Sequence, residues 1–151
     1  MNVVSSSIEI AAPPEAVWAV VMDPQRLHEW VSIHRGLRSA SADPPHEGST
    51  MEQLLHLRGA DIRVQWLLVE CRAPSFARWE GHGPARSSAE TEYRLTPAGS
   101  GTRFDYRNDF RAPLGAFGAL ASRTVMGNTP QREADRSLAA LRELLERAPS
   151  G

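Results

Sequence analysis

Apolar and polar residues alternate along most of the chain, a pattern that predicts β-strands with one buried face. In the first predicted strand, Val4, Ile8 and Ile10 share one face. Turns that contain Pro or Gly separate most of the strands. The predicted strands cover residues 3–11, 33–41, 50–57, 62–72, 76–82, 88–96 and 102–111.

The last predicted strand separates apolar from charged side chains most clearly. One face is formed by Phe104, Tyr106, Asn108 and Phe110. The other face is formed by Arg103, Asp105, Arg107, Asp109 and Arg111. A hairpin loop over residues 97–101 joins this strand to the one before it. We expect Glu92 to pair with Arg107 and Arg94 with Asp105, because opposite charges would then lie side by side.

Two regions show helical periodicity instead. Pro14 can begin a short amphipathic helix, and Asp23 can cap a second short helix over residues 25–30. From about residue 115 to residue 147 a stripe recurs at three- and four-residue steps, which predicts one long helix kinked by Pro130. The stripe consists of Phe117, Leu120, Thr124, Asn128, Gln131, Ala134, Leu138, Leu141 and Leu145.

The order of these elements predicts the architecture. An antiparallel sheet with one apolar face must bury that face, and only the C-terminal helix is long enough to cover it. We therefore expect a single α+β domain over residues 1–151, a curved seven-stranded antiparallel sheet wrapped around the long helix. The two short helices follow the first strand.

The predicted sheet and helix both turn polar in the middle of their apolar faces. Asn108 stands among aromatic residues, and the helix stripe passes through Thr124, Asn128 and Gln131. Convergent polar groups in an apolar space are typical of a ligand cavity. Alternatively, Asn128 and Gln131 satisfy backbone groups freed by Pro130 or face water. The predicted lining consists of Trp30, Leu55, Leu57, Trp66, Leu68, Tyr93, Phe104, Tyr106, Asn108, Phe110, Phe117, Leu120, Thr124, Asn128 and Gln131.

Composition narrows the chemistry. The 17 basic residues are all Arg, which excludes Schiff-base and P-loop chemistry on a lysine. The single cysteine, Cys71, excludes an internal disulfide. The five His form no spaced metal motif, so we expect neither a metal nor a cofactor. His34, which follows Trp30, is the best placed of them for general-base chemistry.

Charge and hydropathy bear on the partners and the cellular location of the protein. A net charge of −1 gives no reason to expect a nucleic-acid partner. No basic, apolar leader opens the sequence and no run of 18 apolar residues occurs, so we predict a cytoplasmic protein without a membrane span. Leu67, Val69 and Cys71, on the predicted outer face, could support a homodimer.

The N-terminal segment 7–18, SIEIAAPPEAVW, with Asp23-Pro24 and Glu29-Trp30, resembles the opening of the START-like (SRPBCC) superfamily. This group includes polyketide cyclase/dehydrase-like proteins and plant pathogenesis-related proteins. Further similar residues are Gly48-Ser49, Trp66, Pro74, Leu95-Thr96-Pro97 and Gly101-Thr102-Arg103. The resemblance covers nearly the whole chain and implies a helix-grip fold with a hydrophobic ligand cavity.

Two subgroups imply different functions. Polyketide aromatase/cyclases are similar around Asn128-Thr129 and Arg132, and they imply catalytic roles for Arg72, Tyr106 and Asn128. Leu68 stands where their second strand tryptophan is found. A set of actinobacterial single-domain proteins, some named as toxins of toxin–antitoxin pairs, is similar over residues 30–34 (WVSIH) and at Gly59 and Trp66.

Three functions therefore remain open at the level of the sequence. The first is binding of a hydrophobic small molecule that is polyketide-, lipid- or aromatic-like. The second is catalysis of cyclisation or dehydration of such a molecule. The third is a protein-interaction role as a toxin–antitoxin component, which would call for a filled core and an exposed apolar patch.

Overall fold

The computed structural model describes residues 2–42, 44–57, 59–111 and 129–147. Its seven strands form one antiparallel sheet in the order β1-β7-β6-β5-β4-β3-β2. The strand bounds are β1 Asn2–Ile10, β2 His34–Ala40, β3 Thr50–Leu57, β4 Ala60–Arg72, β5 Phe76–His82, β6 Ser88–Ala98 and β7 Gly101–Arg111. All consecutive strands from β2 onward pair as neighbours, and β1 closes the order beside β7. The predicted seven-stranded antiparallel sheet is confirmed.

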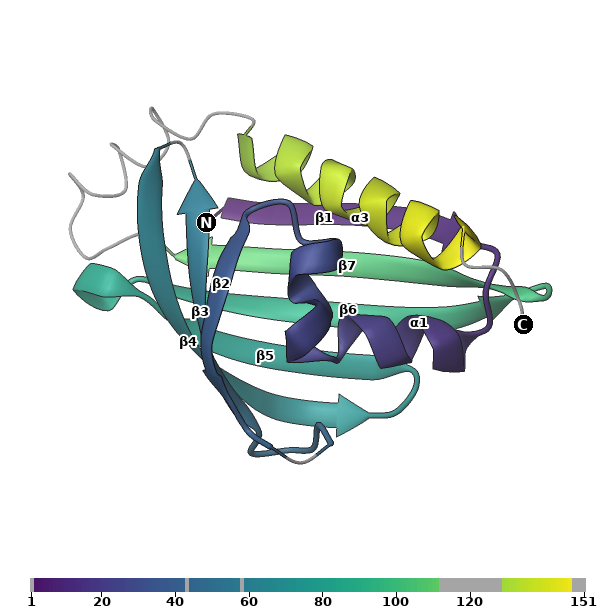
Figure 1. The fold of residues 1–151 in the computed structure, drawn as a ribbon, viewed down its shortest axis with the longest axis horizontal. Coiled ribbons are helices and arrows are strands. Elements are labelled where there is room, and N and C mark those ends of the chain that lie inside the picture. Colours follow the sequence, from purple (N-terminus) through teal and green to yellow (C-terminus); the bar gives the residue numbers. More distant parts are fainter. Residues whose placement is uncertain (1, 43, 58, 112–128, 148–151) are drawn as a thin grey trace.

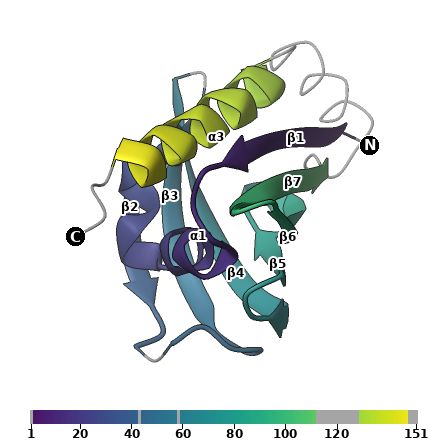
Figure 2. The same cartoon turned by 90° about the vertical axis from the view of Figure 1, so that its right-hand side faces the viewer.

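The helices cover the concave side of this curved sheet (Figure 1). Helix α1 spans Pro14–Val21, and the 3-10 helix η1 spans Pro24–Glu29 with Asp23 as its N-cap. Helix α3, Thr129–Arg147, runs along β1 and closes the open side of the sheet (Figure 2). A short 3-10 turn, η2 Pro84–Arg86, was not predicted. No helix in the described ranges is both long and apolar enough to cross a membrane.

Part of the predicted long helix cannot be compared with the structure. Residues 112–128, including Phe117, Leu120, Thr124 and Asn128, lie outside the described residues. Pro130 occupies the first turn of α3, where its missing N–H leaves no hydrogen bond unmade. The predicted kink near residues 127–128 also lies outside the described residues.

The register of the β6–β7 hairpin follows the predicted charge pairing. Glu92 lies opposite Arg107, with an ion pair of 3.5 Å, and Arg94 lies opposite Asp105. The second pair forms no ion pair, because Asp105 accepts from Arg103 at 3.1 Å while the Arg94 guanidinium lies over a phenyl ring. The connecting loop has two residues instead of five, with Gly99 at φ +61° as the turn requires.

A β-bulge in β4 overturns one prediction about which side chains face inward. The pairing with β5 shifts between Leu68 and Glu70, so every later residue of the strand turns to the opposite face. Strict alternation along β4 would place Arg72, the candidate catalytic residue, beside Trp66 on the inner face. Instead Arg72 is 63% exposed and pairs with Glu70 at 3.1 Å.

The same bulge corrects the predicted dimer face. Cys71 packs against the core instead of pointing outward, and burial raises the pKa of its thiol. Leu67, which precedes the bulge, remains 40% exposed on the outer face. An outer apolar face made of Leu67, Val69 and Cys71 therefore does not form as predicted.

Packing between the sheet and the helices is uneven. Towards the C-terminal half of α3 the space is solid, because Phe104 of β7 and Leu141 of α3 are both fully buried there. Val17 of α1 and Leu27 of η1 fill the same core. Towards the N-terminal half of α3 the side chains no longer meet, and a cavity opens.

Candidate functional site

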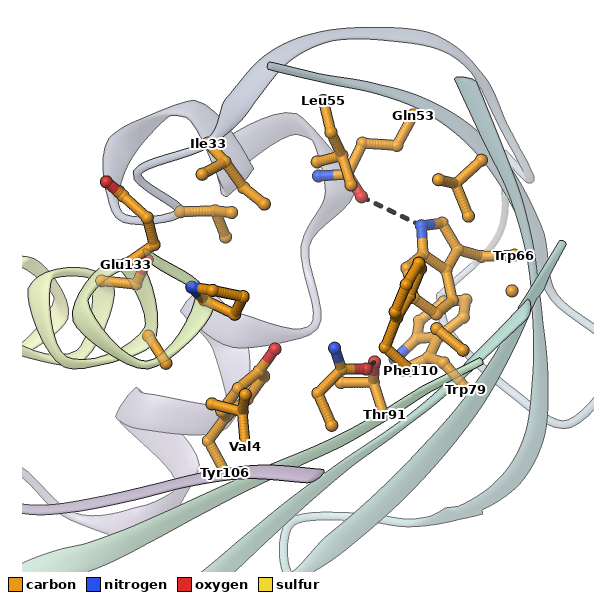
Figure 3. Close-up of a pocket in the computed structure, with 18 of the residues that line it drawn as sticks. Val4, Ile33, Gln53, Leu55, Trp66, Trp79, Thr91, Tyr106, Phe110 and Glu133 are labelled. Atoms are coloured by element: carbon orange, nitrogen blue, oxygen red, sulfur yellow. Dashed lines mark hydrogen bonds between the residues drawn. The ribbon is translucent and has the colours of Figure 1, made fainter. Parts of the chain in front are cut away.

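The cavity has a volume of about 600 Å³ and lies between the sheet and the first turns of α3. Figure 3 shows that its wall combines aromatic rings with a few polar groups. The described wall is formed mainly by Val4 from β1, Trp30, Val31 and Ile33 after η1, Leu55 from β3, Trp66 from β4, Trp79 from β5, Tyr93 from β6, Tyr106, Asn108 and Phe110 from β7, and Ala134 and Leu138 from α3. A mostly apolar space with few polar groups has the character of a small-molecule site.

A glycine makes room for the ring of Trp66 on the cavity wall. Gly81 of β5 lies directly opposite Trp66 in the sheet. A Cβ atom at Gly81 would lie 2.7 Å from the indole ring, far inside contact distance. The missing side chain therefore allows the indole to occupy the space above β5.

The β6–β7 floor carries one polar cluster. Thr91 Oγ1 donates a hydrogen bond to Asn108 Oδ1 at 2.9 Å, and these residues are direct partners across the two strands. Tyr106, two residues before Asn108, shares the same face, and its hydroxyl points into the cavity in Figure 3. Burial raises the pKa of Tyr106 to about 12, so the phenol remains protonated near neutral pH. Burial also raises the pKa of Tyr93 nearby.

A second polar group, on β3 and β4, is internally satisfied. Trp66 Nε1 donates to Gln53 Oε1 at 3.0 Å, and Gln53 Nε2 lies 2.9 Å from His34 Nδ1. Because Gln53 already accepts from the indole, its amide nitrogen must donate to His34. His34 is thereby held with Nδ1 unprotonated. It lies behind the cavity wall and not on it.

This hydrogen bond makes a pH prediction. Burial, and secondarily the charge of His28, lowers the pKa of His34 below its ordinary value of 6.5. Below about pH 6.5 the imidazole of His34 is protonated in the unfolded chain but not yet in the folded protein. The contribution of His34 to the free energy of unfolding is therefore fully present above about pH 6.5 and decreases as the pH falls below that value. We expect the melting temperature to fall between about pH 8 and pH 5 less in His34→Gln, which keeps an acceptor but does not titrate, than in the unsubstituted protein. Equal falls in both proteins would contradict this role of His34.

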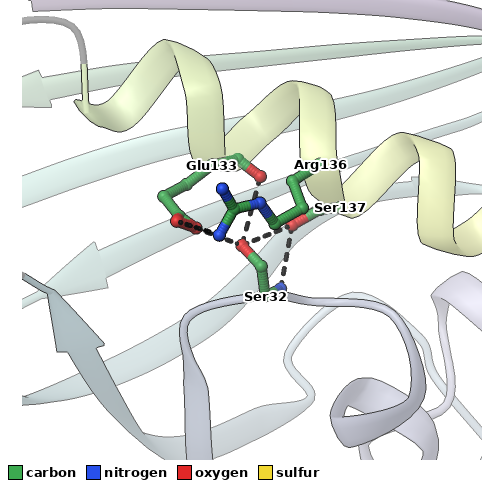
Figure 4. A network of polar contacts seen from close by, with 4 residues as sticks. All are labelled: Ser32, Glu133, Arg136 and Ser137. Carbon is green, nitrogen blue, oxygen red and sulfur yellow. Dashed lines mark hydrogen bonds and ion pairs between the residues drawn. The ribbon is translucent and has the colours of Figure 1, made fainter.

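The edge of the cavity is tied together by polar contacts between α3 and the loop after η1 (Figure 4). The Ser32 backbone N–H donates to Ser137 Oγ at 2.9 Å, and Ser32 Oγ donates to Glu133 Oε2 at 2.8 Å. Arg136 also donates to the Glu133 carboxylate, at 3.3 Å. These contacts hold α3 over the opening, and Glu133 brings one acidic group to the wall.

The structure brings together much of the predicted lining. These predicted residues line the cavity: Trp30, Leu55, Trp66, Tyr93, Tyr106, Asn108, Phe110 and Gln131. Leu68 and Phe104 lie instead in the packed core, both fully buried. Arg72 is exposed on the outer face, for the reason given by the bulge. The side chain of Leu57 and the residues Phe117, Leu120, Thr124 and Asn128 lie outside the described part of the chain.

Gln131 satisfies a backbone group of β1 and not one freed by Pro130. Its amide nitrogen donates to the Ser5 carbonyl of β1 at 2.8 Å, although the residue still borders the cavity. The bond fastens the first turn of α3 to the sheet edge.

Sequence reasoning missed Gln53, Thr91, Trp79 and Gly81. Two of them had a signal. Thr91 follows from the register that pairs Glu92 with Arg107, because the same register places it opposite Asn108. Gln53 is the polar position between Met51 and Leu55 on one face of β3. Trp79 and Gly81 carried no comparable signal.

The site offers little for metal or acid–base chemistry in its described part. Within the described ranges, no three His, Cys, Asp or Glu side chains are grouped so that they could hold a metal ion. Trp30 Nε1 is buried and has no acceptor among the described residues. The polar groups of the residues on this part of the wall are amides, hydroxyls and indole N–H groups, with one carboxylate at the edge.

Known proteins resemble this chain in sequence and in fold. "Toxin Rv0910" of Mycobacterium tuberculosis is 27% identical over 124 residues, 81% of this chain and 86% of that protein. The crystal structure of TTHA0849 from Thermus thermophilus superposes with a TM-score of 0.78 at 20% identity, covering 99% of this chain and 100% of that one. A START superfamily protein from Mycobacterium smegmatis gives a TM-score of 0.74 at 17% identity, covering 97% and 99%.

The two structural likenesses establish the fold, which is the START-like helix-grip arrangement expected from the N-terminal motif. A family model described as polyketide cyclase/dehydrase and lipid transport matches residues 1–146. Because that match covers nearly the whole chain, the protein belongs to the polyketide cyclase/dehydrase and lipid transport family of START-like proteins.

Proposed function

We propose that the protein binds a hydrophobic small molecule in the cavity between the sheet and α3. The observation that carries this proposal is the cavity itself, about 600 Å³ of largely apolar space beside a packed cluster of buried side chains. A void of this size forfeits packing energy unless something fills it. A flat aromatic, polyketide-like or lipid-like molecule matches the rings of Trp66, Trp79 and Phe110.

Catalysis of the cyclase type has less support. Arg72, which the resemblance implied as a catalytic cation, lies outside the cavity. Tyr106, with a pKa of about 12, is a weak acid and not a general base at neutral pH. The described lining therefore holds a ligand better than it moves protons, and we place carrier, sensor or storage roles before an enzyme.

The name of the mycobacterial relative raises a toxin role as the remaining alternative. Such a role through protein contacts would call for an exposed apolar patch and a filled core. Among the described residues only Val3 and Leu67 are large apolar side chains with substantial exposure, and the cavity is open. These features favour the small molecule.

Blocking the cavity tests the proposal. Ala134 lies buried on the cavity face of α3, so Ala134→Phe should fill the space and weaken ligand binding about tenfold or more. Binding of fluorene, a flat apolar probe, can be followed by quenching of the three tryptophans on the wall, Trp30, Trp66 and Trp79.

Ala139→Phe is the matched control, because Ala139 lies on the exposed face of the same helix. We expect it to bind fluorene like the unsubstituted protein. Native mass spectrometry of freshly purified protein should also reveal a co-purified molecule that Ala134→Phe lacks. Absence of binding by the unsubstituted protein, or equal binding by both variants, would contradict the proposal.

A further inference from the structure

The polar groups of the cavity differ in how much of their hydrogen-bonding capacity remains open. On the β3–β4 side the indole of Trp66 donates to Gln53, and the Gln53 amide donates to His34. The indole N–H of Trp66, the amide oxygen of Gln53 and one N–H of the Gln53 amide are therefore already engaged in hydrogen bonds within the protein. This side presents mainly ring surface to a ligand.

The β6–β7 floor has open donors. Thr91 donates its only hydroxyl proton to Asn108 Oδ1. This hydrogen bond orients the Asn108 amide so that its oxygen faces Thr91 on β6. The Asn108 amide nitrogen, whose two N–H groups have no acceptor among the described residues, then remains as a donor. The protonated hydroxyl of Tyr106 stands two residues away on the same strand face. Two neutral donors thus belong to the same face of β7 and both line the cavity.

The charges on the described part of the cavity wall disfavour anions. The chain contains no lysine, and no arginine lines the cavity among the described residues. Glu133, which is the acidic side chain on the described wall, adds negative charge. A carboxylate or phosphate group buried against the described wall would lose its hydration without gaining a partner of opposite charge from that wall, which is costly.

We propose that the cavity takes an uncharged, flat ligand with a hydrogen-bond-accepting oxygen of the ketone or quinone type. The oxygen accepts from Asn108 Nδ2 and the Tyr106 hydroxyl, while the rest of the ligand lies against the rings of the β3–β5 side. Thr91 is a positioning residue that orients the Asn108 amide. This inference rests on the proposed ligand-binding function and adds the chemical class of the ligand.

Three probes of one shape test it: fluorene, 9-fluorenone, which has a ketone oxygen, and fluorene-9-carboxylate, which has a charge. The preference is the dissociation constant of fluorene divided by that of fluorenone. We expect it to fall about fivefold to tenfold in Asn108→Leu and in Tyr106→Phe, the value of one lost hydrogen bond. The carboxylate should bind at least about tenfold more weakly than fluorenone.

Thr91 provides the second pair of variants. Thr91→Val should reduce the preference for fluorenone although the Asn108 side chain is intact, whereas Thr91→Ser, which keeps the hydroxyl, should retain it. The infrared carbonyl band of bound fluorenone should lie at lower frequency in the unsubstituted protein and in Thr91→Ser than in Thr91→Val. A purely structural role of Thr91 would not shift this band.

The outcomes separate the two proposals. Binding of fluorene and fluorenone with the same preference in every variant, or tight binding of the carboxylate, overturns the inference and leaves the cavity as a binding site. Failure of all three probes to bind overturns ligand binding in the cavity, and the ketone subsite with it.

Discussion

Replacement of Phe104 by alanine is expected to lower the free energy of unfolding by about 3–5 kcal/mol. Phe104 is fully buried on β7 and lies at the centre of an aromatic cluster. Its ring centroid is 5.5 Å from that of Tyr93 and 6.2 Å from that of Trp30. The alanine variant would leave a void that neither strand nor helix can close, because the backbone there is held in the sheet. Urea unfolding followed by circular dichroism measures the effect.

Phe76 offers a matched control on the opposite face of the sheet. It is also buried, but its ring lies between the guanidinium groups of Arg72 and Arg94, each 4.9 Å from the ring centroid. Phe76→Ala should cost less, about 1–2 kcal/mol, since flexible arginine stems can move into the vacated space. Equal losses from the two substitutions would show that the cluster around Phe104 is not the centre of the core.

Leu141→Ala is expected to cost about 2–5 kcal/mol and to loosen the docking of α3. Leu141 is fully buried in the core below the cavity. The contacts of α3 with β1 at the helix edges, such as Ser6 Oγ to Asp135 Oδ1 at 2.7 Å, are exposed and replace little of that packing. Hydrogen exchange should show the amides of α3 losing protection by a larger factor than those of β6 and β7.

Leu145, one turn further along the helix, is the control for this substitution. It is only half-buried. We expect Leu145→Ala to cost about 1 kcal/mol and to leave exchange in α3 nearly unchanged. If Leu145→Ala released the helix as strongly as Leu141→Ala, the buried stripe of α3 would be rotated from the position described.

Both large effects fall in the solid half of the space between sheet and helix. The hollow half is bounded by the same elements: β7 continues from Phe104 to Tyr106, Asn108 and Phe110, and α3 runs back from Leu141 to Ala134. The packed half thus supplies the stability that allows the other half to remain open. We expect substitutions on the cavity floor, such as Asn108→Leu, to change binding more than stability.

Local patterns in the sequence were sufficient for most of the fold. Strands such as Thr50–Leu57 and Phe76–His82 were predicted to the residue, because alternation and turn residues are local properties of the chain. The register of β6 and β7 also followed from charges alone, with Glu92 opposite Arg107. Membership of the START-like superfamily was visible in the N-terminal motif.

The candidate site was only partly predictable. Tyr106, Asn108 and Phe110 could be assigned to the cavity because they share a face of one strand with period two. Leu68 and Phe104 also face inward by alternation along their strands, but they lie in the packed core. Alternation shows which face of a strand points inward, but it does not show where along the strand the packed core ends and the cavity begins.

By itself, the sequence determined most of the described elements, their order, the antiparallel sheet and the inward face of most strands, since these depend on short-range periodicity. Only the tertiary structure decided that a bulge after Leu68 turns Arg72 out of the cavity, and that Thr91 orients Asn108 while Gln53 links Trp66 to His34. A one-residue shift in strand pairing cannot be recognised from the residue types of β4. Hydrogen bonds between side chains on different strands depend on distances in space, which the alternation of apolar and polar residues does not specify.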